Sequence, residues 1–261
     1  MNKNRICTTC GTQYNNVTQN ECPICLDDRQ YVPESGQSWT NLEELLQKYS
    51  VIVNELHDRL YEIKSAPVFG IGQRALLVIS PQGNVLWDCI AVLNEPLIEF
   101  IKSKGGVQCI AISHPHYYTT MNEWAAVFNC PIHLHKDDEQ WIFNKGERVS
   151  CWSGDKKMLW DGMKIINIGG HFPGSCMLHV PFLSEEGALL CGDSFYISPS
   201  KQHASVMYSY PNRIPLPLSE ITRISERMKA LQYDTVYGFY DFQNLIGNGK
   251  EVIEASLERY R

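Results

Sequence analysis

Four cysteines near the amino terminus constrain this chain more than any other feature. Cys7 and Cys10 form one C-x2-C motif, Cys22 and Cys25 form a second, and eleven residues separate the two. Each motif lets two thiolates converge on one ion, and four thiolates complete a tetrahedral shell at about 2.3 Å from zinc. The surrounding segment has few large apolar side chains, so ion binding has to stabilise its fold. The sequence therefore predicts a structural metal site at these four cysteines.

The cysteine segment is similar to zinc ribbons and to short-spaced rubredoxin-like modules, whose halves also read C-x2-C-G and C-P-x-C. Four thiolates accept iron as well as zinc. Leu26 follows the last cysteine where rubredoxins usually carry glycine, which favours zinc. The alternatives, two disulfides or a redox dithiol, fit less well with a reducing cytosol and with two copies of the motif. We predict a zinc-ribbon-like module over residues 1–35.

Composition indicates that the rest of the chain folds around a substantial core. The chain has 261 residues, of which 44% are hydrophobic and 20% charged, and this excludes wholesale disorder. A formal net charge of −6 offers no general field for nucleic acid or anionic lipid. No apolar run approaches the roughly 18 to 20 residues that cross a bilayer, and no signal-peptide core follows the first residues. We expect a soluble, cytoplasmic protein without a membrane partner, for which nucleic acid is not the expected ligand.

Apolar runs and amphipathic patterns alternate after a linker at residues 31–38, and a helix is expected to start at about residue 40. Ile221, Ile224 and Met228 share one face of a further predicted helix. Strands are predicted from short apolar runs, at residues 75–79, 85–91, 107–112, 165–168, 188–191 and 235–237. Mixed sheets with helices outside, an α+β class, are therefore expected over residues 36–261. The six scattered cysteines are expected to be buried free thiols.

A second set of metal-binding residue types follows three of the predicted strands. His114 and His116 come after the run at residues 107–112, and residues two apart in an extended segment point the same way. His171 follows the run at 165–168 through two glycines, and Asp193 follows the run at 188–191 through one. One sheet edge would thus bring three imidazoles and a carboxylate together, a set that suits zinc or non-haem iron.

These motifs, in this order, resemble those of the metallo-β-lactamase-fold superfamily over roughly residues 60–261. The stretch of residues 169–175, which reads GGHFPGS, is the most specific part of the resemblance. The resemblance implies a four-layer αβ/βα sandwich, with a metal-binding site at one edge of its paired sheets. A short four-cysteine module joined to such a domain resembles an uncharacterised subgroup of this superfamily.

The sequence departs from the superfamily pattern where a second ion would bind. Members usually read H-x-H-x-D-H, whereas Tyr118 and Thr119 stand at the last two positions, and Phe239 replaces a later histidine. The resemblance therefore implies one ion, Zn²⁺ or Fe²⁺, held by the three histidines with Asp193. Asp193 is also a candidate catalytic residue. Tyr118 and Glu123 are further candidates for proton transfer, although a phenol is a poor base.

Three functions remain open on sequence grounds. The first is a mononuclear metallohydrolase that acts on a small-molecule ester, thioester or lactone, since an ion held by neutral imidazoles activates water and polarises a carbonyl. The second is a non-haem iron oxidoreductase or dioxygenase of the same fold. The third is a catalytically degenerate scaffold that binds a protein partner through its cysteine module. The sequence leaves a homo-oligomer open.

Overall fold

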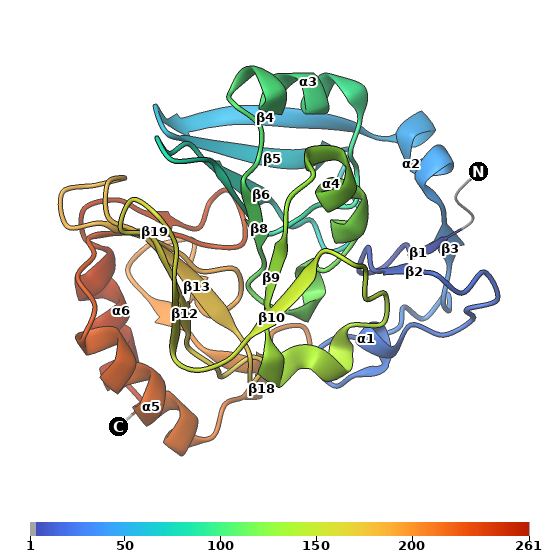
Figure 1. The fold of residues 1–261 in the computed structure, drawn as a ribbon. Helices are drawn as coiled ribbons and strands as arrows, with labels where there is room; N and C mark the ends of the chain where they lie inside the picture. Colours follow the sequence, from blue (N-terminus) through green and yellow to red (C-terminus); the bar gives the residue numbers. More distant parts are fainter. Residues whose placement is uncertain (1–3, 261) are drawn as a thin grey trace.

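Two β-sheets, each with helices on its outer face, form the body of the protein in a computed structural model that describes residues 4–260 (Figure 1). The seven-stranded sheet has the order β10 (Val149–Trp152), β9 (Ile132–His135), β8 (Cys109–Ala111), β7 (Val85–Trp87), β6 (Ala75–Val78), β5 (Leu60–Ala66) and β4 (Ser50–His57). The six-stranded sheet has the order β11 (Lys156–Met158), β12 (Lys164–Asn167), β13 (Cys176–Val180), β14 (Ala188–Leu190), β19 (Thr235–Tyr237) and β20 (Asn244–Leu245).

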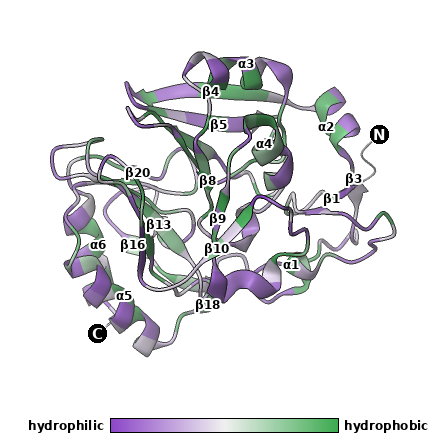
Figure 2. Cartoon of the chain, in the orientation of Figure 1, coloured by the Kyte–Doolittle hydropathy of each residue, from purple (hydrophilic) through white to green (hydrophobic). Residues whose placement is uncertain are grey.

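Alternation along the central strands sorts their side chains into separate cores. On β6, Leu76 and Val78 face the six-stranded sheet and pack with Leu178 and Leu190, whereas Leu77 points to the outer face. Both faces of each sheet are covered, which explains why these strands read as continuous apolar runs rather than as alternating ones. Figure 2 shows hydrophobic residues along the inner strands and hydrophilic ones on much of the outer surface of the helices.

Four helices complete the layers. The outer core of the seven-stranded sheet includes residues from α3 (Glu95–Ser103) and α4 (Met121–Phe128). The outer core of the six-stranded sheet includes residues from α5 (Leu218–Lys229) and α6 (Gly249–Glu258). The apolar face predicted for α5 is buried there, including Ile224. The predicted α+β fold, a four-layer αβ/βα sandwich, is confirmed.

The amino-terminal module has its own small sheet. β1 (Arg5–Cys7) lies between β2 (Gln13–Tyr14) and β3 (Trp39–Thr40). Cys22 is the N-cap of the short helix α1 (Pro23–Leu26), and Cys25 lies within that helix. β3 lies beyond residue 35, and the domain boundary there stays a prediction. Helix α2 (Leu42–Lys48) follows close to the predicted start, but its cap lies one residue later than the capping box Thr40–Glu43 predicted: the side chain of Asn41 accepts a hydrogen bond from the Glu44 amide.

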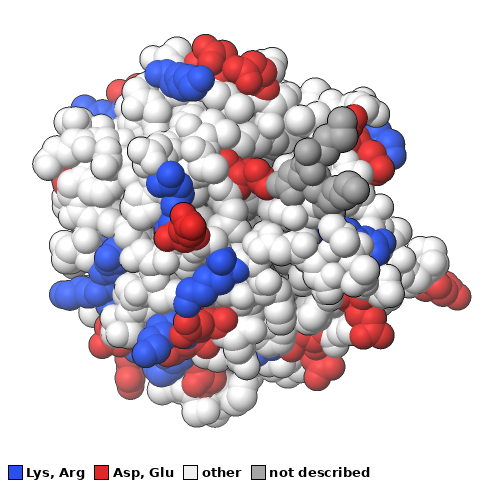
Figure 3. Space-filling model, turned by 45° about the vertical axis from the view of Figure 1, so that its right-hand side comes forward, with Lys and Arg blue, Asp and Glu red and all other residues white. Residues whose placement is uncertain are grey.

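The remaining short elements lie in connections. They are η1 (Pro115–Tyr117), η2 (Lys136–Trp141), β15 (Tyr196–Ile197), β16 (Ala204–Ser205), β17 (Met207–Ser209) and β18 (Ile214–Pro215). Across residues 4–260, no helix combines the length and the apolar character that a membrane crossing needs. On the face drawn in Figure 3, acidic and basic side chains are interspersed.

Candidate metal centres

The four cysteine thiols meet in the interior of the amino-terminal module. Their Sγ atoms all lie within 4.8 Å of one another, and the four residues are at most 1% exposed. Cys7 Sγ lies 3.6 Å from Cys25 Sγ, and Cys10 Sγ lies 3.5 Å from Cys22 Sγ. Four thiolates bound tetrahedrally at about 2.3 Å would be about 3.8 Å apart, so the spacing fits one ion.

The pKa values of the clustered thiols also favour a bound cation. Hydrogen bonds from Cys10, Cys22 and Cys25 lower the pKa of Cys7, whereas burial raises the pKa of Cys10 well above its usual value. The cluster alone therefore stabilises some of its thiols as anions at the expense of others. A bound divalent ion removes this conflict because it deprotonates each coordinating thiol.

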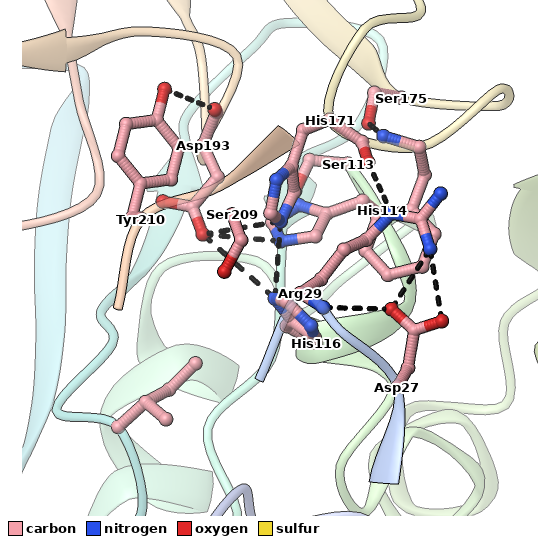
Figure 4. A network of polar contacts seen from close by, with 12 residues as sticks. Asp27, Arg29, Ser113, His114, His116, His171, Ser175, Asp193, Ser209 and Tyr210 are labelled. Atoms are coloured by element: carbon pink, nitrogen blue, oxygen red, sulfur yellow. Dashed lines mark hydrogen bonds and ion pairs between the residues drawn. The ribbon is translucent and has the colours of Figure 1, made fainter. Parts of the chain in front are cut away.

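The histidine centre is assembled from three connections at one edge of the paired sheets. His114 follows β8 and His116 lies in η1, while His171 and Asp193 follow β12 and β14. Figure 4 shows the three imidazole rings converging opposite the Asp193 carboxylate. Gly192 has φ +53°, and a Cβ there would collide with the neighbouring Ser113 hydroxyl, so glycine is required for the chain to deliver Asp193.

The four donor groups lie at separations that a single ion would span. His114 Nε2 is 3.4 Å from Asp193 Oδ2, and His171 Nε2 is 3.3 Å from His116 Nδ1. All four donors lie within 4.8 Å of one another. Ligands at about 2.1 Å from a tetrahedral ion are about 3.4 Å apart. The His114 Nε2 atom is buried and, within the described part of the chain, has no hydrogen-bond partner. These residues therefore fit a metal ion.

A hydrogen-bonded sequence behind His114 fixes the orientation of its ring. The Ser113 hydroxyl lies 2.8 Å from His114 Nδ1, which leaves Nε2 to face the other donors. The Ser113 amide in turn donates to Asp88 Oδ1 at 2.7 Å. On the opposite side, the Tyr210 hydroxyl donates to the backbone oxygen of Asp193 at 2.9 Å. Such outer contacts hold metal ligands in position and select the tautomer.

Burial keeps the imidazoles ready to bind a cation. It lowers the pKa of His116 to about 4 and holds the pKa of His171 well below its usual range. Both rings are therefore neutral at pH 7 and offer lone pairs. Burial by itself would raise the pKa of Asp193, but the neighbouring His114 and His116 side chains, 3.4 and 3.9 Å from its Oδ2, bring it below its usual value. The centre therefore places two neutral rings, those of His116 and His171, and the His114 ring beside an ionised carboxylate.

The histidine centre opens into a cavity of about 450 Å³. His116, His171 and Asp193 line the cavity, and aromatic side chains form much of its wall. Tyr196 packs against Tyr210 with 5.9 Å between ring centroids. The wall also contains Phe239 and Tyr240, and the cysteine module contributes Arg29, Gln30 and Tyr31. A small molecule that enters this cavity would contact both parts of the chain.

Two of the residues predicted to be catalytic lie away from this cavity. Tyr118 is 4% exposed and belongs to the core under the seven-stranded sheet, where burial raises its pKa well above the usual value. Glu123 Oε1 accepts a hydrogen bond from Gln13 of the cysteine module at 3.1 Å. Neither side chain lines the cavity that Asp193 lines. The catalytic roles of Tyr118 and Glu123 stay predictions, and the structure does not bring them to the imidazoles.

Sequence reasoning missed three residues that support the centre. Asp88 had a signal, because a carboxylate interrupts the apolar run at residues 85–91. Tyr210 was one of many tyrosines after the motifs, and nothing in the sequence distinguished it. Arg29, whose Nε donates to the backbone oxygen of His171, carried no signal at all, since this contact depends on how the module docks.

The fold and the site define a metallo-β-lactamase-fold protein with an amino-terminal four-cysteine module. A structure of the DIM-1 metallo-β-lactamase matches with a TM-score of 0.60 at 14% identity, covering 82% of this chain and 100% of that one. The metallo-β-lactamase FIM-1 from Pseudomonas aeruginosa, in its mono-zinc form, matches with a TM-score of 0.55 at 12% identity, covering 80% and 95%. At these identities the likeness shows the fold.

The chain belongs to the same protein family as the uncharacterised protein YmaE of Bacillus subtilis (strain 168). The two are 40% identical over 260 residues, which cover 98% of this chain and 94% of YmaE. No protein-family profile matches the sequence.

Proposed function

We propose that the chain is a mononuclear metallohydrolase that cleaves an ester, thioester or lactone of a small molecule. One observation carries the proposal: the donor atoms of three imidazoles and a carboxylate lie within 4.8 Å of one another at a cavity of about 450 Å³. The fold, which is shared with metallo-β-lactamases, supports hydrolytic chemistry at this edge of the sheets. Both the substrate class (an ester, thioester or lactone) and the presence of a single ion are part of the proposal.

In this proposal, His114, His116 and His171 hold the ion, and Asp193 lies beside them. The chemistry that a divalent ion would supply there is a lowering of the pKa of a water molecule from about 15.7 to about 7 and polarisation of a carbonyl oxygen. Asp193 is ionised at neutral pH, and its side chain is 18% exposed, so it can accept a proton at the cavity surface. The Tyr210 hydroxyl keeps the Asp193 backbone in place for this step.

The side chains where a second ion would bind support a single ion. Phe239 packs against Tyr117 with ring centroids 5.4 Å apart, and Tyr118 and Thr119 are buried without facing the cavity. Within residues 4–260, the groups of three or more His, Cys, Asp or Glu donors close enough to share an ion are the cysteine set and the histidine set. One ion suits carbonyl substrates better than phosphodiesters, for which two ions clamp the attacking and leaving oxygens.

The wall of the cavity supports a substrate with an apolar or aromatic part. Tyr240 stacks on Phe242 at 5.6 Å, and Tyr196 meets Phe242 edge-on at 6.3 Å, so neighbouring rings support each other. Apolar walls with a few polar groups are typical of small-molecule sites. Arg213 also lines the cavity and offers a cation to a polar group of the substrate.

Hydrolysis of activated substrates tests the proposal. The purified protein would be stripped with a chelator, reloaded with Zn²⁺ or Fe²⁺, and assayed against panels of aryl esters, acyl thioesters and lactones. We expect turnover that disappears on stripping and returns on reloading. The same rate before and after removal of the ion from the histidine centre would overturn the proposal.

The donor set also supports a second candidate, a non-haem iron oxidoreductase or dioxygenase. Imidazole and carboxylate ligands suit iron as well as zinc, and four thiolates accept either metal. Elemental analysis and a visible spectrum separate the two: we expect zinc in both sites and no colour, whereas iron in the histidine centre would favour the oxidoreductase. A reducing, cytoplasmic location is part of the proposal, since all ten cysteines are unpaired.

A further inference from the structure

Arg29 is a buried cation that joins the cysteine module to the histidine centre. It lies four residues after Cys25 and is 9% exposed. Its Nε donates a hydrogen bond of 2.5 Å to the backbone oxygen of His171, which lies in the loop between β12 and β13. Figure 4 shows Arg29 reaching from the module toward this loop.

Several contacts fix the Arg29 side chain in one orientation. Nη1 donates to both carboxylate oxygens of Asp27, at 2.8 and 3.0 Å. The guanidinium carbon lies 4.3 Å from the centroid of the Phe172 ring and 4.1 Å from that of Tyr208. A planar guanidinium held by a carboxylate and two rings loses its rotational freedom and presents Nε in a defined direction. The hydrogen bond to His171 is therefore directed rather than incidental.

The backbone around Arg29 is also held from two sides. On the amino-terminal side, the thiol cluster holds the backbone, because Arg29 lies four residues after Cys25. On the other side, Asn212 Nδ2 donates to the backbone oxygens of Asp28 and Gln30, at 2.9 and 2.8 Å. The segment thus connects the thiol cluster with the loop that carries His171.

We propose that Arg29 is a positioning residue for His171, and that the cysteine module, through Arg29, sets the affinity of the histidine centre for its ion. The inference rests on the metal centre proposed above and adds a role for the module. His171 arrives on a loop with left-handed glycines, Gly169 (φ +68°) and Gly170 (φ +83°), whose backbone conformation the sheet alone does not determine. A fixed donor on the His171 carbonyl restricts that loop to the conformation in which the ring meets its neighbours.

Metal affinity, rather than activity, is the readout. The protein would be loaded with one equivalent of zinc, and protection of four thiols from a thiol reagent would confirm that the ion occupies the cysteine site. Cobalt(II) would then be titrated into the histidine centre in competition with a chelator. Arg29→Lys retains the charge without the planar fork, and Arg29→Gln removes the charge. Arg5→Gln is the matched control, because Arg5 lies in the same module and contacts Trp39 and Asn20 instead.

We expect both Arg29 variants to bind cobalt about 10- to 100-fold more weakly than wild type, the range for residues that orient metal ligands. Arg5→Gln should stay within about twofold of wild type, as surface substitutions do. Variants at Arg29 that keep four protected thiols and bind cobalt like Arg5→Gln would overturn the inference. If the Arg29 variants lose thiol protection, the variant Asp27→Asn decides the question, because it weakens the hold on the guanidinium while Arg29 keeps the Nε that donates to His171. An unchanged cobalt affinity in Asp27→Asn overturns the inference, and a lower affinity supports it. A wild-type protein that takes up no second ion would instead overturn the proposed function.

Discussion

The two metal centres of this protein are built in opposite ways. The cysteine centre takes its four donors from residues 7–25, all of them buried, and the chain closes around them. The histidine centre takes its donors from residues 114–193, from connections that follow three strands, and opens into a cavity of about 450 Å³. The first is local and closed, whereas the second is long-range and open.

This difference indicates which centre needs its ion in order to fold. Within residues 4–260, Tyr14 and Ile24 are the large buried side chains of the thiol cluster, with the partly buried Val32, Trp39 and Trp141 packed against it. So small an apolar cluster would need a bound ion for much of its stability. The histidine centre lies at the edge of sheets whose apolar cores are continuous without it, so the folding of these sheets does not depend on its ion. A closed thiolate site suits a structural ion, while an open site leaves room for substrate.

The largest expected effect comes from breaking the cysteine centre. Cys22→Ser removes a thiolate, so we expect loss of that ion and unfolding of the module, detected as fast amide exchange and proteolysis within residues 5–31. Cys151→Ser is the control, since Cys151 is a partly exposed thiol far from the cluster in sequence. A variant at Cys22 that keeps its ion and its exchange protection would contradict the contrast between the centres.

Breaking the histidine centre should separate ion binding from folding. His116→Ala deletes a ligand, so we expect the affinity for the second ion to fall by more than the 10- to 100-fold typical of outer-shell changes. The variant should still bind the ion of the cysteine centre. Its melting temperature should be close to that of wild type when neither protein carries an ion in the histidine centre. The control is His57→Ala, at a partly exposed site in the β4–β5 hairpin. Loss of both ions together in His116→Ala would show that the two centres fold as one unit.

The loop behind His171 offers a pH test. Burial raises the pKa of Asp138 to about 7, against a hydrogen bond from the Gly174 amide and the charge of Arg29. An unfolded aspartate ionises near pH 3.9, so the folded state holds the extra proton between about pH 4 and 7. Asp138 therefore lowers the free energy of unfolding as pH rises through this window.

Asp138→Asn cannot ionise and should lose this pH dependence. Relative to wild type, we expect its free energy of unfolding to rise between pH 4 and 7, by up to about 1.4 kcal/mol per pH unit. Urea unfolding at several pH values measures it, with the exposed neighbour Asp137→Asn as the control. Parallel curves for wild type and Asp138→Asn would show that Asp138 is not held protonated.

The smallest effect concerns the contact between the module and the sandwich. Glu123→Ala removes the acceptor for Gln13, a residue that is 1% exposed, and should cost about 1 kcal/mol of stability or somewhat more. Glu99→Ala, on the exposed face of α3, should stay within about 0.5 kcal/mol. If Glu123→Ala also abolished hydrolysis at unchanged stability, Glu123 would have the catalytic role predicted from sequence.

The sequence predicted the parts of the fold that follow from local pattern. Two C-x2-C motifs at short spacing identify a thiolate site, because the ligands of such a site are close along the chain. The three histidines and Asp193 come together as expected, because they follow apolar strands and strand ends meet at sheet edges, while their role as ligands stays a prediction. The continuous apolar run at β6 and the apolar face of α5 were also readable from local pattern.

What the sequence did not predict depends on packing between distant segments. The contacts of Arg29 with the His171 loop depend on how the module docks, and docking has no periodic signal. Tyr118 and Glu123 were assigned by their place in a motif, whereas their surroundings come from the 3₁₀ turn η1 and from the module packed against α4. The long hairpin of β4 and β5 was also missed, because β4 is half-exposed and reads as a mixed pattern.

A crystal structure with anomalous data at the zinc and iron edges tests the central claim most directly. The protein should be purified without chelators and crystallised with its own ions. We predict two peaks per chain, one among the four sulfurs and one between the three imidazoles and Asp193. An empty histidine centre at full cysteine occupancy, or a third peak beside Phe239 and Thr119, would contradict a single-ion centre.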